Sequence, residues 1–294
     1  MTQTPDQATP RVLVGVDGSD DGLRATRYAA GRALRKDIDL WLVHALDDGV
    51  VAGGWGVIYD PTVLEQAGKA AITQAVEVAV QRGLPRERIH SDVLVGHPAV
   101  IMEELSQRAE SVVVGRRAAS GLERMFVGST STSLAATAAC PVIVISSAST
   151  PGPATTHERI GVAIGSGKSD KGLRWGCQEA ARRDTVLEII HVAPSQSSSA
   201  LALVSPPSKS EETQRGRLER ELEARADALR RDFPQVKIET TCLIGQPSDL
   251  LIGRSADLDL LILTVRPRAI TGIALGGAVR AVLAHALCPV GLIR

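Results

Sequence analysis

The chain has no excess of either charge. Its 294 residues carry 33 lysine and arginine side chains and 33 aspartate and glutamate side chains, so the formal net charge is zero. Proteins that bind nucleic acid or anionic membranes by electrostatics present a basic patch or a basic overall balance. We therefore expect no nucleic-acid partner and no membrane partner.

Long hydrophobic runs are also missing. Apolar stretches such as Val112–Val114 and Leu260–Leu263 are far shorter than the roughly 20 residues of a membrane-spanning helix. The opening residues, MTQTPDQATP, are polar and lack the apolar segment of a secretory signal. These absences predict a cytoplasmic protein with a disordered N-terminus at residues 1–10.

Cysteine is scarce, and the motifs of common catalytic sites are absent. The four cysteines show no C-x-x-C spacing, and Cys140 and Cys288 stand just before apolar strands, so packing explains them better than a metal or a disulfide. There is no G-x-S-x-G elbow, H-E-x-x-H helix or Walker A lysine. We expect a protein that is not an enzyme and holds no metal through its own side chains. Weak ATP hydrolysis, or autophosphorylation at Ser129 or Ser131, is the exception we keep open.

What the sequence does contain is an internal repeat. Three anchors recur 147 to 149 positions later: Val43-His44 as Ile190-His191, Gly96-His97-Pro98 as Gly245-Gln246-Pro247, and Ala139-Cys140-Pro141-Val142 as Leu287-Cys288-Pro289-Val290. So small a drift indicates two copies of one domain of about 140 residues. We predict a first domain at 11–146, a linker at 147–158 and a second domain at 159–294.

Each copy alternates strand and helix patterns. In the first copy we expect strands at 11–17, 38–45, 90–95, 111–114 and 141–145, and helices at 20–36, 61–82, 99–109 and 129–138. In the second copy we expect strands at 159–164, 186–193, 236–243, 259–264 and 289–293, and a long charged helix near 210–231. Helical crossovers between strands predict an α/β fold. It consists of two tandem, doubly wound, Rossmann-like domains, each with a five-stranded parallel sheet of order 3-2-1-4-5.

The histidines are scattered among strands and loops. His44 and His191 occupy the same apolar strand in the two copies, which favours a packing role. His97 lies in a loop that could border a site, but Gln246 takes its place in the second copy.

Ligands of doubly wound sheets bind beyond the carboxyl ends of the strands, where the strand order reverses. Here that place lies between the first and fourth strands, which are followed by Asp17-Gly18-Ser19 and by the segment GRRAASG at 115–121. Asp17 could contact a ligand or simply cap the first helix. Arg116 and Arg117 could add positive charge or be solvated.

The helix that opens at Gly128 has the features of a phosphate site. A helix N-terminus offers amide donors and partial positive charge, glycine permits close approach, and Ser129, Thr130 and Ser131 add hydroxyl donors. A plain helix N-cap is the alternative interpretation of Gly128-Ser129.

These residues resemble the universal stress protein family, specifically its tandem-domain members of the ATP-binding type, found among actinobacteria. The resemblance covers almost the whole chain and rests on VGVDGS at 14–19, LVHA at 42–45, GHP at 96–98 and CPVIVI at 140–145. The nucleotide motif of the family is G-x-x-G, nine residues, then G-S or G-T. Gly115, Ala118, Gly128 and Ser129 fit that frame, with alanine in place of the second glycine.

The resemblance implies an adenine nucleotide as ligand: ATP, with or without Mg²⁺, or another such as cyclic AMP. Asp17, Val16 and Val43 would meet adenine and ribose, and the glycine motif would surround ribose and phosphates. Ala118 would cost about 1–3 kcal/mol if its place requires a positive φ. The complete predicted site comprises Gly15, Val16, Asp17, Val43, Gly115, Arg116, Arg117, Ala118, Gly121, Gly128, Ser129, Thr130 and Ser131.

The second copy has lost the polar residues of these loops. Aligning Arg27-Tyr28 with Arg174-Trp175 puts Ile164 at the place of Asp17. The other replacements are Thr264 for Gly115, Pro267 for Ala118, and Gly277, Ala278 and Val279 for Ser129, Thr130 and Ser131. Gly276 is retained, so a helix N-terminus remains. We predict that this copy does not hold ATP strongly.

The resemblance also implies antiparallel pairing of the two fifth strands, 141–145 with 289–293. One chain would then be a pseudo-dimer, and two chains could assemble further into a homodimer. Two independent domains on a tether are the alternative. The leading hypothesis is a stress-response regulator in which bound nucleotide orders loops 47–60 and 116–127 and alters contacts with a partner that the sequence does not identify. A nucleotide-free interaction scaffold and an ATP-dependent transferase are the two other hypotheses.

Overall fold

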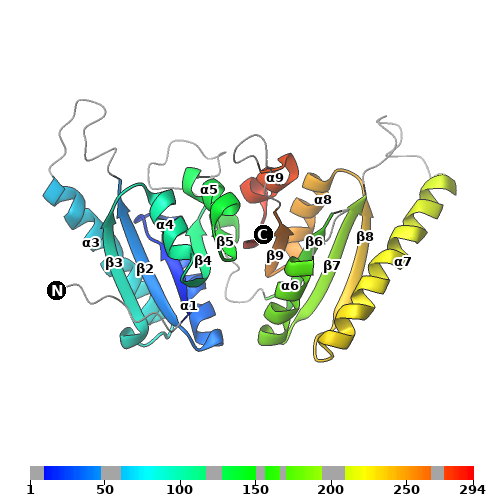
Figure 1. The fold of residues 1–294 in the computed structure, drawn as a ribbon, viewed down its shortest axis with the longest axis horizontal. Coiled ribbons are helices and arrows are strands. Elements are labelled where there is room, and N and C mark those ends of the chain that lie inside the picture. The colour runs from blue at the N-terminus through cyan, green and yellow to red at the C-terminus, as the bar shows by residue number, and fades with distance from the viewer. Residues whose placement is uncertain are drawn as a thin grey trace. The chain divides into compact units, whose positions relative to one another are not determined.

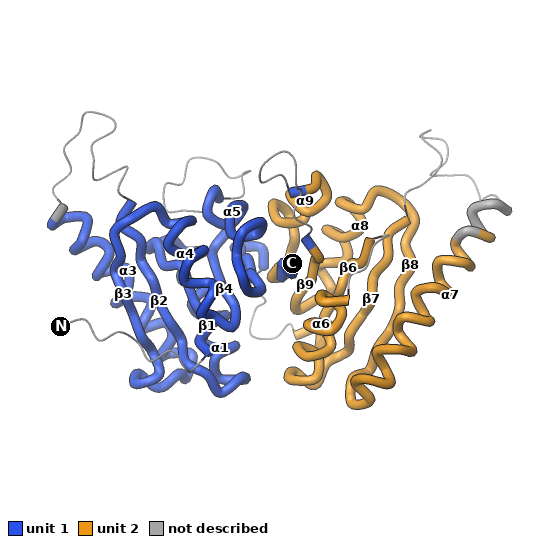
Figure 2. Tube along the Cα trace, in the orientation of Figure 1, with its two compact units in different colours: residues 1–150, 265–275, 291–294 blue, residues 151–264, 276–290 orange. Residues whose placement is uncertain are grey.

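The computed structural model divides into two compact units. One comprises residues 1–150, 265–275 and 291–294, and the other 151–264 and 276–290 (Figure 2). Within them, the residues that the structure describes are 10–47, 61–116, 128–149, 156–165, 170–193, 209–265 and 275–294. Five segments on which predictions fell, 1–9, 48–60, 117–127, 150–155 and 266–274, therefore lie outside the described residues.

The first unit contains a parallel sheet in the order β3-β2-β1-β4-β5 (Figure 1). Its strands are β1 (Arg11–Gly15), β2 (Asp39–Leu46), β3 (Ile89–Val95), β4 (Ala109–Gly115) and β5 (Val142–Ile145), and its helices are α1 (Asp20–Lys36), α3 (Pro61–Gln81), α4 (Pro98–Ser106) and α5 (Ser129–Thr137). Helices α1 and α3 contact each other, as do α4 and α5. The central strand β1 places Val14 beside Leu42 of β2 and Val113 of β4. The predicted strand order is confirmed.

Helix α1 shows how local sequence sets an element. The hydroxyl of Ser19 accepts the Gly22 N–H at 3.0 Å, which caps the start of the helix. Asp37 ends it in the left-handed conformation at a φ of 52°. Between these ends, Ala25 and Ala29 are fully buried. The small alanine side chains let the helix lie close to a sheet whose strands, such as Val112–Val114, are apolar on both faces.

The second repeat of the sequence follows the same plan. Its strands are β6 (Arg159–Ile164), β7 (Val186–Ala193), β8 (Ile238–Ile244), β9 (Leu260–Thr264) and β10 (Val290–Ile293), and its helices are α6 (Asp170–Arg183), α7 (Lys209–Asp232), α8 (Pro247–Arg254) and α9 (Gly277–His285). Strand β6 pairs with β7 and β9, and β7 pairs with β8, all in parallel. The strand that opens each copy is therefore central in its sheet.

Two of the differences between predicted and observed segments have a visible physical cause. The helix expected at 99–109 ends at Ser106, because Ala109 already pairs with Arg11 of the central strand. At the start of the expected linker, Ser147–Ser149 form a 3-10 turn in which the Ser149 hydroxyl donates to the Ser146 carbonyl at 2.8 Å. The first residues after β5 are thus tied to the end of that strand.

Helices α3 and α7 occupy the same place in the two copies but pack differently. Helix α3 lies mainly on β2, whereas α7 lies mainly on the edge strand β8. A glycine is the eighth residue of each helix. A Cβ added to Gly68 of α3 would meet His44 Cδ2 at 2.6 Å, but a Cβ on Gly216 of α7 would meet no described atom within 4 Å. The first helix is therefore held against its sheet at a point where the second is not.

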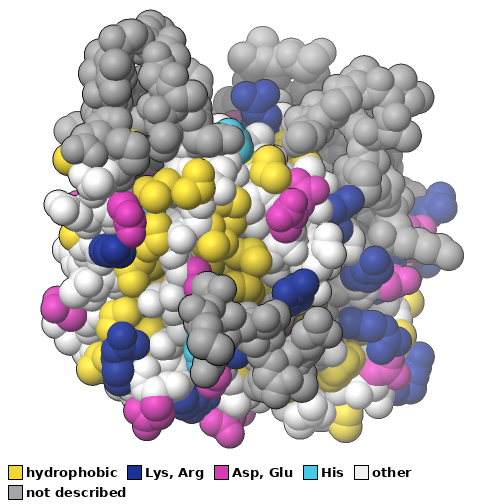
Figure 3. Space-filling view, turned by 60° about the vertical axis from the view of Figure 1, so that its left-hand side comes forward, with side chains coloured by type: hydrophobic (Ala, Val, Ile, Leu, Met, Phe, Trp, Pro, Cys, Tyr) yellow, Lys and Arg dark blue, Asp and Glu magenta, His cyan; other side chains and the backbone are white. Residues whose placement is uncertain are grey.

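Charges of both signs are interspersed on the side of the molecule shown in Figure 3, around a band of hydrophobic side chains. Exposed valines of the first unit include Val95, at the end of β3, and Val100, in α4, which are 70% and 53% exposed. No described helix is long and apolar enough to cross a membrane.

Candidate functional site

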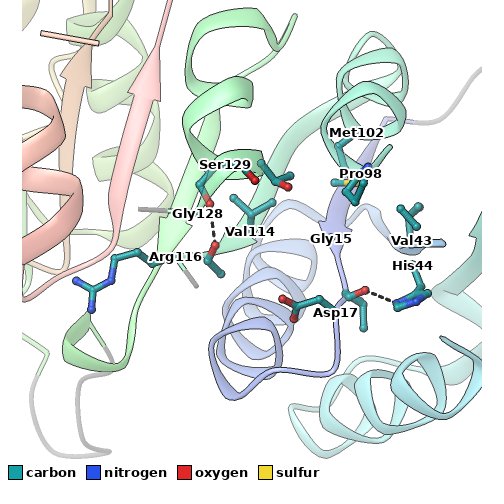
Figure 4. A pocket seen from close by; sticks show the side chains of 15 residues that line it. Gly15, Asp17, Val43, His44, Pro98, Met102, Val114, Arg116, Gly128 and Ser129 are labelled. Carbon is teal, nitrogen blue, oxygen red and sulfur yellow. Dashed lines mark hydrogen bonds between the residues drawn. The ribbon is translucent and has the colours of Figure 1, made fainter. Parts of the chain in front are cut away.

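A cavity of about 150 Å³ opens at the carboxyl ends of β1, β2 and β4 in the first unit (Figure 4). It is lined by Gly15, Val16, Asp17, Val43, His44, Ala45, Pro98, Met102, Val114, Gly115, Arg116, Gly128, Ser129, Thr130 and Ser131. Every predicted site residue that the structure describes is in this set. Arg117, Ala118 and Gly121 lie outside the described residues. The fold therefore brings together residues that are up to 116 positions apart in the sequence, from Gly15 to Ser131.

Asp17 has a local structural role as well as a place on the cavity wall. Its Oδ1 accepts hydrogen bonds from the Ser19 backbone N–H at 3.0 Å and from the Ser19 hydroxyl at 2.6 Å. Gly18, between them, has a φ of 76°, which an L side chain rarely adopts. Asp17 is nevertheless exposed, so stabilising this turn leaves its carboxylate open to a ligand.

Gly115 is required by the approach of helix α1. An added Cβ would lie 2.8 Å from the Asp21 carbonyl carbon and 2.9 Å from the Gly22 nitrogen. Both are backbone atoms, so the helix itself would have to move. The sequence suggested that glycine at this place allows a ligand close to the backbone. In the structure it lets the first turn of α1 lie against the end of β4.

The start of helix α5 faces the cavity. Its N-cap, Gly128, offers no side chain, and the first intrahelical bond is made by the Thr132 N–H to the Gly128 carbonyl at 3.0 Å. The amides of residues 129–131 therefore precede that bond and carry the positive end of the helix dipole. Such an arrangement binds anions.

The three predicted hydroxyl donors line the cavity, but the proton of Ser131 is already used within the protein. The Ser131 side chain is 2% exposed and donates its single proton to the Gly115 carbonyl at 2.9 Å. This hydrogen bond joins the start of α5 to the end of β4 and uses the proton that Ser131 was predicted to donate to a ligand. Ser129 is exposed and Thr130 half-buried, and both line the cavity.

Arg116 is neither solvated nor directed at the cavity. Arg116 is only 5% exposed. Its backbone N–H donates to the Ile145 carbonyl at 2.6 Å, and its backbone carbonyl accepts from the Gly128 N–H at 2.9 Å. Figure 4 shows its side chain extending away from Asp17 and His44. The alternative in which the Arg116 side chain is solvated is therefore wrong in this structure.

Sequence reasoning missed five lining residues: His44, Ala45, Pro98, Met102 and Val114. Pro98 belongs to the GHP motif and opens α4, whereas His97, which sequence analysis placed near a site, is exposed and absent from the lining. His44 and Ala45 follow Val43 at the same strand end, which was a usable signal. Met102 had no signal, because its place depends on how α4 packs.

The second unit keeps the framework of this site but not its polar groups. His191 Nδ1 donates to the Ile164 carbonyl at 3.1 Å, as His44 Nδ1 does to the Val16 carbonyl at 2.7 Å. Ile164 therefore corresponds to Val16, and Gly165 corresponds to Asp17. The sequence alignment that set Ile164 against Asp17 was wrong by one residue. The left-handed aspartate that follows the helix, Asp37 or Asp184, comes 21 positions after Val16 but only 20 positions after Ile164. The carboxylate is lost in either alignment.

Thr264 stands in the second unit where the first unit has Gly115, the glycine against which helix α1 lies. The strand pairs Val14 with Val113 and Val162 with Ile262 confirm that Thr264 corresponds to Gly115. Its Oγ1 is buried without a hydrogen-bond partner among the described residues, and a Cβ added to Gly172 of α6 would meet it at 2.5 Å.

Cysteine chemistry and metal binding find little support. All four cysteines are free thiols. Burial raises the pKa of Cys140 to about 12, and burial likewise raises the pKa of Cys288 to about 12. A high pKa keeps each thiol protonated and unreactive. Within the described segments, no group of three or more His, Cys, Asp or Glu side chains could hold a metal ion.

The fold and the cavity together define a class: a tandem α/β protein with a ligand cavity where the strand order reverses. The model of the universal stress protein family matches residues 9–146 and again residues 156–294. The chain therefore belongs to the universal stress protein family. The predicted membership and the predicted fold class are confirmed.

Relatives of similar length share the tandem organisation. Universal stress protein Rv2005c of Mycobacterium tuberculosis is 30% identical over 290 residues, which cover 95% of each chain. A universal stress protein of Mycolicibacterium smegmatis is 29% identical over 297 residues, covering 96% of each. The crystal structure of a universal stress protein from Archaeoglobus fulgidus aligns with a TM-score of 0.69 at 15% identity, over 97% of this chain and 96% of that one. This last likeness shows the fold alone.

Proposed function

We propose that the first repeat binds an adenine nucleotide, with ATP as the leading ligand, and that the protein acts as a nucleotide-dependent regulator in the stress response. One observation carries the proposal. The carboxylate of Asp17, after β1, and the open N-terminus of α5 line the same cavity. A nucleotide needs both kinds of group, an acceptor for sugar hydroxyls and a donor set for phosphates.

The chemistry of the wall fits the three parts of a nucleotide. Val16 and Val43 are buried apolar residues that can flank a base. The Asp17 carboxylate only accepts hydrogen bonds, and ribose hydroxyls donate them. The amides at the start of α5 and the Ser129 hydroxyl suit phosphate oxygens. Since Arg116 points away, the described part of the site recognises the phosphates through backbone dipoles, and Mg²⁺, where present, would be held by the phosphates and water.

We further propose that the second repeat retains no nucleotide, so that each chain binds one. Gly165 stands where the carboxylate of Asp17 would be needed, and residues 277–279 replace the hydroxyls. The helix N-terminus at Gly276 is retained, but there an anion would meet backbone N–H groups without side-chain hydroxyls. The domain bounds 11–146 and 159–294 belong to the same proposal, with a linker at 147–158.

The first experiment is to denature the purified protein, identify any released nucleotide by mass and count it per chain. If none is released, isothermal titration with ATP replaces the count. About one adenine nucleotide per chain supports a single working site. Two per chain overturn the proposal for the second repeat. None, together with no ATP binding, favours the nucleotide-free scaffold.

Variants at Asp17 separate its two roles. Asp17→Asn keeps an Oδ1 acceptor for the turn to Ser19 but loses the charge and the second acceptor oxygen. Asp17→Ala loses the charge and both acceptor oxygens. If Asp17 binds the ligand, both variants weaken ATP binding by about tenfold or more, which corresponds to roughly 1.4 kcal/mol. If it only stabilises the turn, Asp17→Asn binds ATP as the wild type does.

Two serines provide a second comparison. Ser129→Ala removes an exposed hydroxyl from the cavity wall and should weaken ATP binding by several-fold with little effect on stability. Ser131→Ala removes the bond to the Gly115 carbonyl and should lower stability by about 1 kcal/mol. Unchanged ATP binding in Ser129→Ala would contradict the assignment of the phosphate side of the cavity.

A further inference from the structure

We infer that His44 is a positioning residue of the nucleotide site: its imidazole sets the place of the Val16–Asp17 corner and couples that corner to helix α3. This inference rests on the proposed function, because the effect it predicts is on nucleotide binding. His44 itself lines the cavity, at the end of β2 (Figure 4).

The corner is held by two consecutive residues of β2. The Val16 N–H donates to the Val43 carbonyl at 2.8 Å, and the Val16 carbonyl accepts from His44 Nδ1 at 2.7 Å. A carbonyl oxygen can only accept, so Nδ1 carries the proton, and in the neutral ring Nε2 is the acceptor. Both polar groups of the Val16 backbone are therefore fixed, and Asp17 is the next residue along the chain. The direction in which the Asp17 side chain leaves the strand therefore depends on these two hydrogen bonds.

The opposite edge of the ring lies against α3. A Cβ added to Gly68 would meet His44 Cδ2 at 2.6 Å and Nε2 at 3.1 Å, so only glycine fits on the helix at this place. Gly68 is buried. The imidazole is thus wedged between the β1 corner and a helix, and a displacement of α3 toward the sheet would push the ring, and through it Val16.

The second unit supplies an internal comparison. His191 makes the same bond to Ile164, at 3.1 Å, which shows that joining the two strand ends is a framework role common to both copies. The residue that follows Ile164 is Gly165, which has no side chain to position. Helix α7 stands clear at Gly216, where an added Cβ meets no described atom within 4 Å. The wedge between helix and carboxylate is a feature of the first unit.

Five variants of the full chain test the inference by isothermal titration with ATP, with thermal unfolding as the stability readout. His44→Leu removes the bond to Val16, and His44→Asn keeps it, because the asparagine Nδ2 donor can take the place of Nδ1. We expect His44→Leu to bind ATP roughly tenfold more weakly, because it loses one hydrogen bond that positions Val16. His44→Asn should recover most of that affinity. His191→Leu, the matched control, should lower stability but leave the affinity for ATP unchanged.

The glycines provide a test that leaves His44 in place. Gly68→Ala should force the ring toward Val16 and weaken ATP binding by roughly tenfold. Gly216→Ala, the matched control, makes the same change at the eighth residue of α7, where there is space, and should leave binding unchanged and raise the unfolding temperature slightly. This pair decides the matter if His44→Leu does not fold.

The outcomes separate this inference from the function on which it rests. Wild-type protein that binds no adenine nucleotide overturns the proposed function. Wild-type binding combined with unchanged affinity in His44→Leu and Gly68→Ala overturns the positioning role alone. Equal weakening in His44→Leu and His44→Asn also overturns it, because the bond to Val16 would then not be the cause.

Discussion

Replacing Gly115 with alanine adds one methyl group where the structure has no room for it. The new Cβ would lie 2.8 Å from the Asp21 carbonyl carbon, 2.9 Å from the Gly22 nitrogen and 3.0 Å from the Asp21 Cβ. Ordinary van der Waals contacts of a Cβ begin near 3.4 Å. The first turn of α1 would therefore have to retreat by about half an ångström, carrying the cap at Ser19 with it.

The energetic cost follows from the kind of atoms that must move. Overpacking a well-packed interior costs about 1–3 kcal/mol, and here two of the three neighbours are backbone atoms that cannot rotate away. With a urea dependence of about 2 kcal/mol per molar, a loss of about 2 kcal/mol lowers the urea midpoint of Gly115→Ala by about 1 M. The cavity shares this corner, so ATP affinity should fall in the same variant.

A matched control lies at the corresponding contact of the second unit. In Gly172→Ala the new Cβ meets Thr264 Oγ1 at 2.5 Å, but this is a side-chain tip with no hydrogen bond among the described residues to lose. The threonine can rotate, and alanine gains up to about 1 kcal/mol of helix propensity over glycine. Urea unfolding should therefore show a much smaller change. A midpoint of Gly115→Ala equal to or above that of the wild type would refute this account of the packing.

Three further results are expected. Burial by itself raises the pKa of Glu110, but the charges and hydrogen bonds of Arg32 and Lys36 prevail and lower it from 4.5 to about 2. A depressed pKa stabilises the fold above pH 4.5, and this contribution, about 3 kcal/mol, is lost as the pH falls through about 2. Urea unfolding of Glu110→Gln should be less dependent on pH in that window, and parallel pH curves for variant and wild type would contradict this. Burial raises the pKa of Cys140 and Cys288 to about 12, so a thiol reagent at pH 8 should label them far more slowly in the native protein than in denaturant; rapid native labelling would count against it. Light scattering should give about twice the chain mass of 31.0 kDa if two chains assemble as the family resemblance implies, whereas the single-chain mass would reject the homodimer.

Elements with strong local signals were predicted well. The bounds of α1, 20–36, were predicted correctly, because the serine cap and the left-handed Asp37 that end the helix are properties of nearby residues. The end of α4 was predicted three residues too far along, since Ala109 is drawn into β4 by its pairing with Arg11, a residue almost 100 positions away. Local periodicity indicates which face of an element is buried. It does not indicate whether a residue at the end of a helix will instead pair with a strand from a distant part of the chain.

Site residues divide in the same way. Residues that reach the cavity by ending a strand or opening a helix, such as Asp17 and Ser129, were placed correctly, because topology brings those ends together. The roles of Arg116, Ser131 and His44 were not found. Each role depends on the direction that a side chain takes once the elements have packed. Arg116 extends away from the cavity, Ser131 donates to the Gly115 carbonyl, and His44 donates to the Val16 carbonyl.

By itself the sequence determined the repeat, the order of strands and helices, the family and the loops that meet at the carboxyl edge of the first sheet. These properties follow from periodicity and from the right-handed connections of parallel strands, which leave few alternatives. Only the tertiary structure decided that Gly165, not Ile164, stands in place of Asp17, and that a histidine is wedged against Gly68 in one copy alone. A hydrogen bond or a steric contact depends on distances of a few tenths of an ångström between residues far apart in the chain, and these are set by the packing of whole elements.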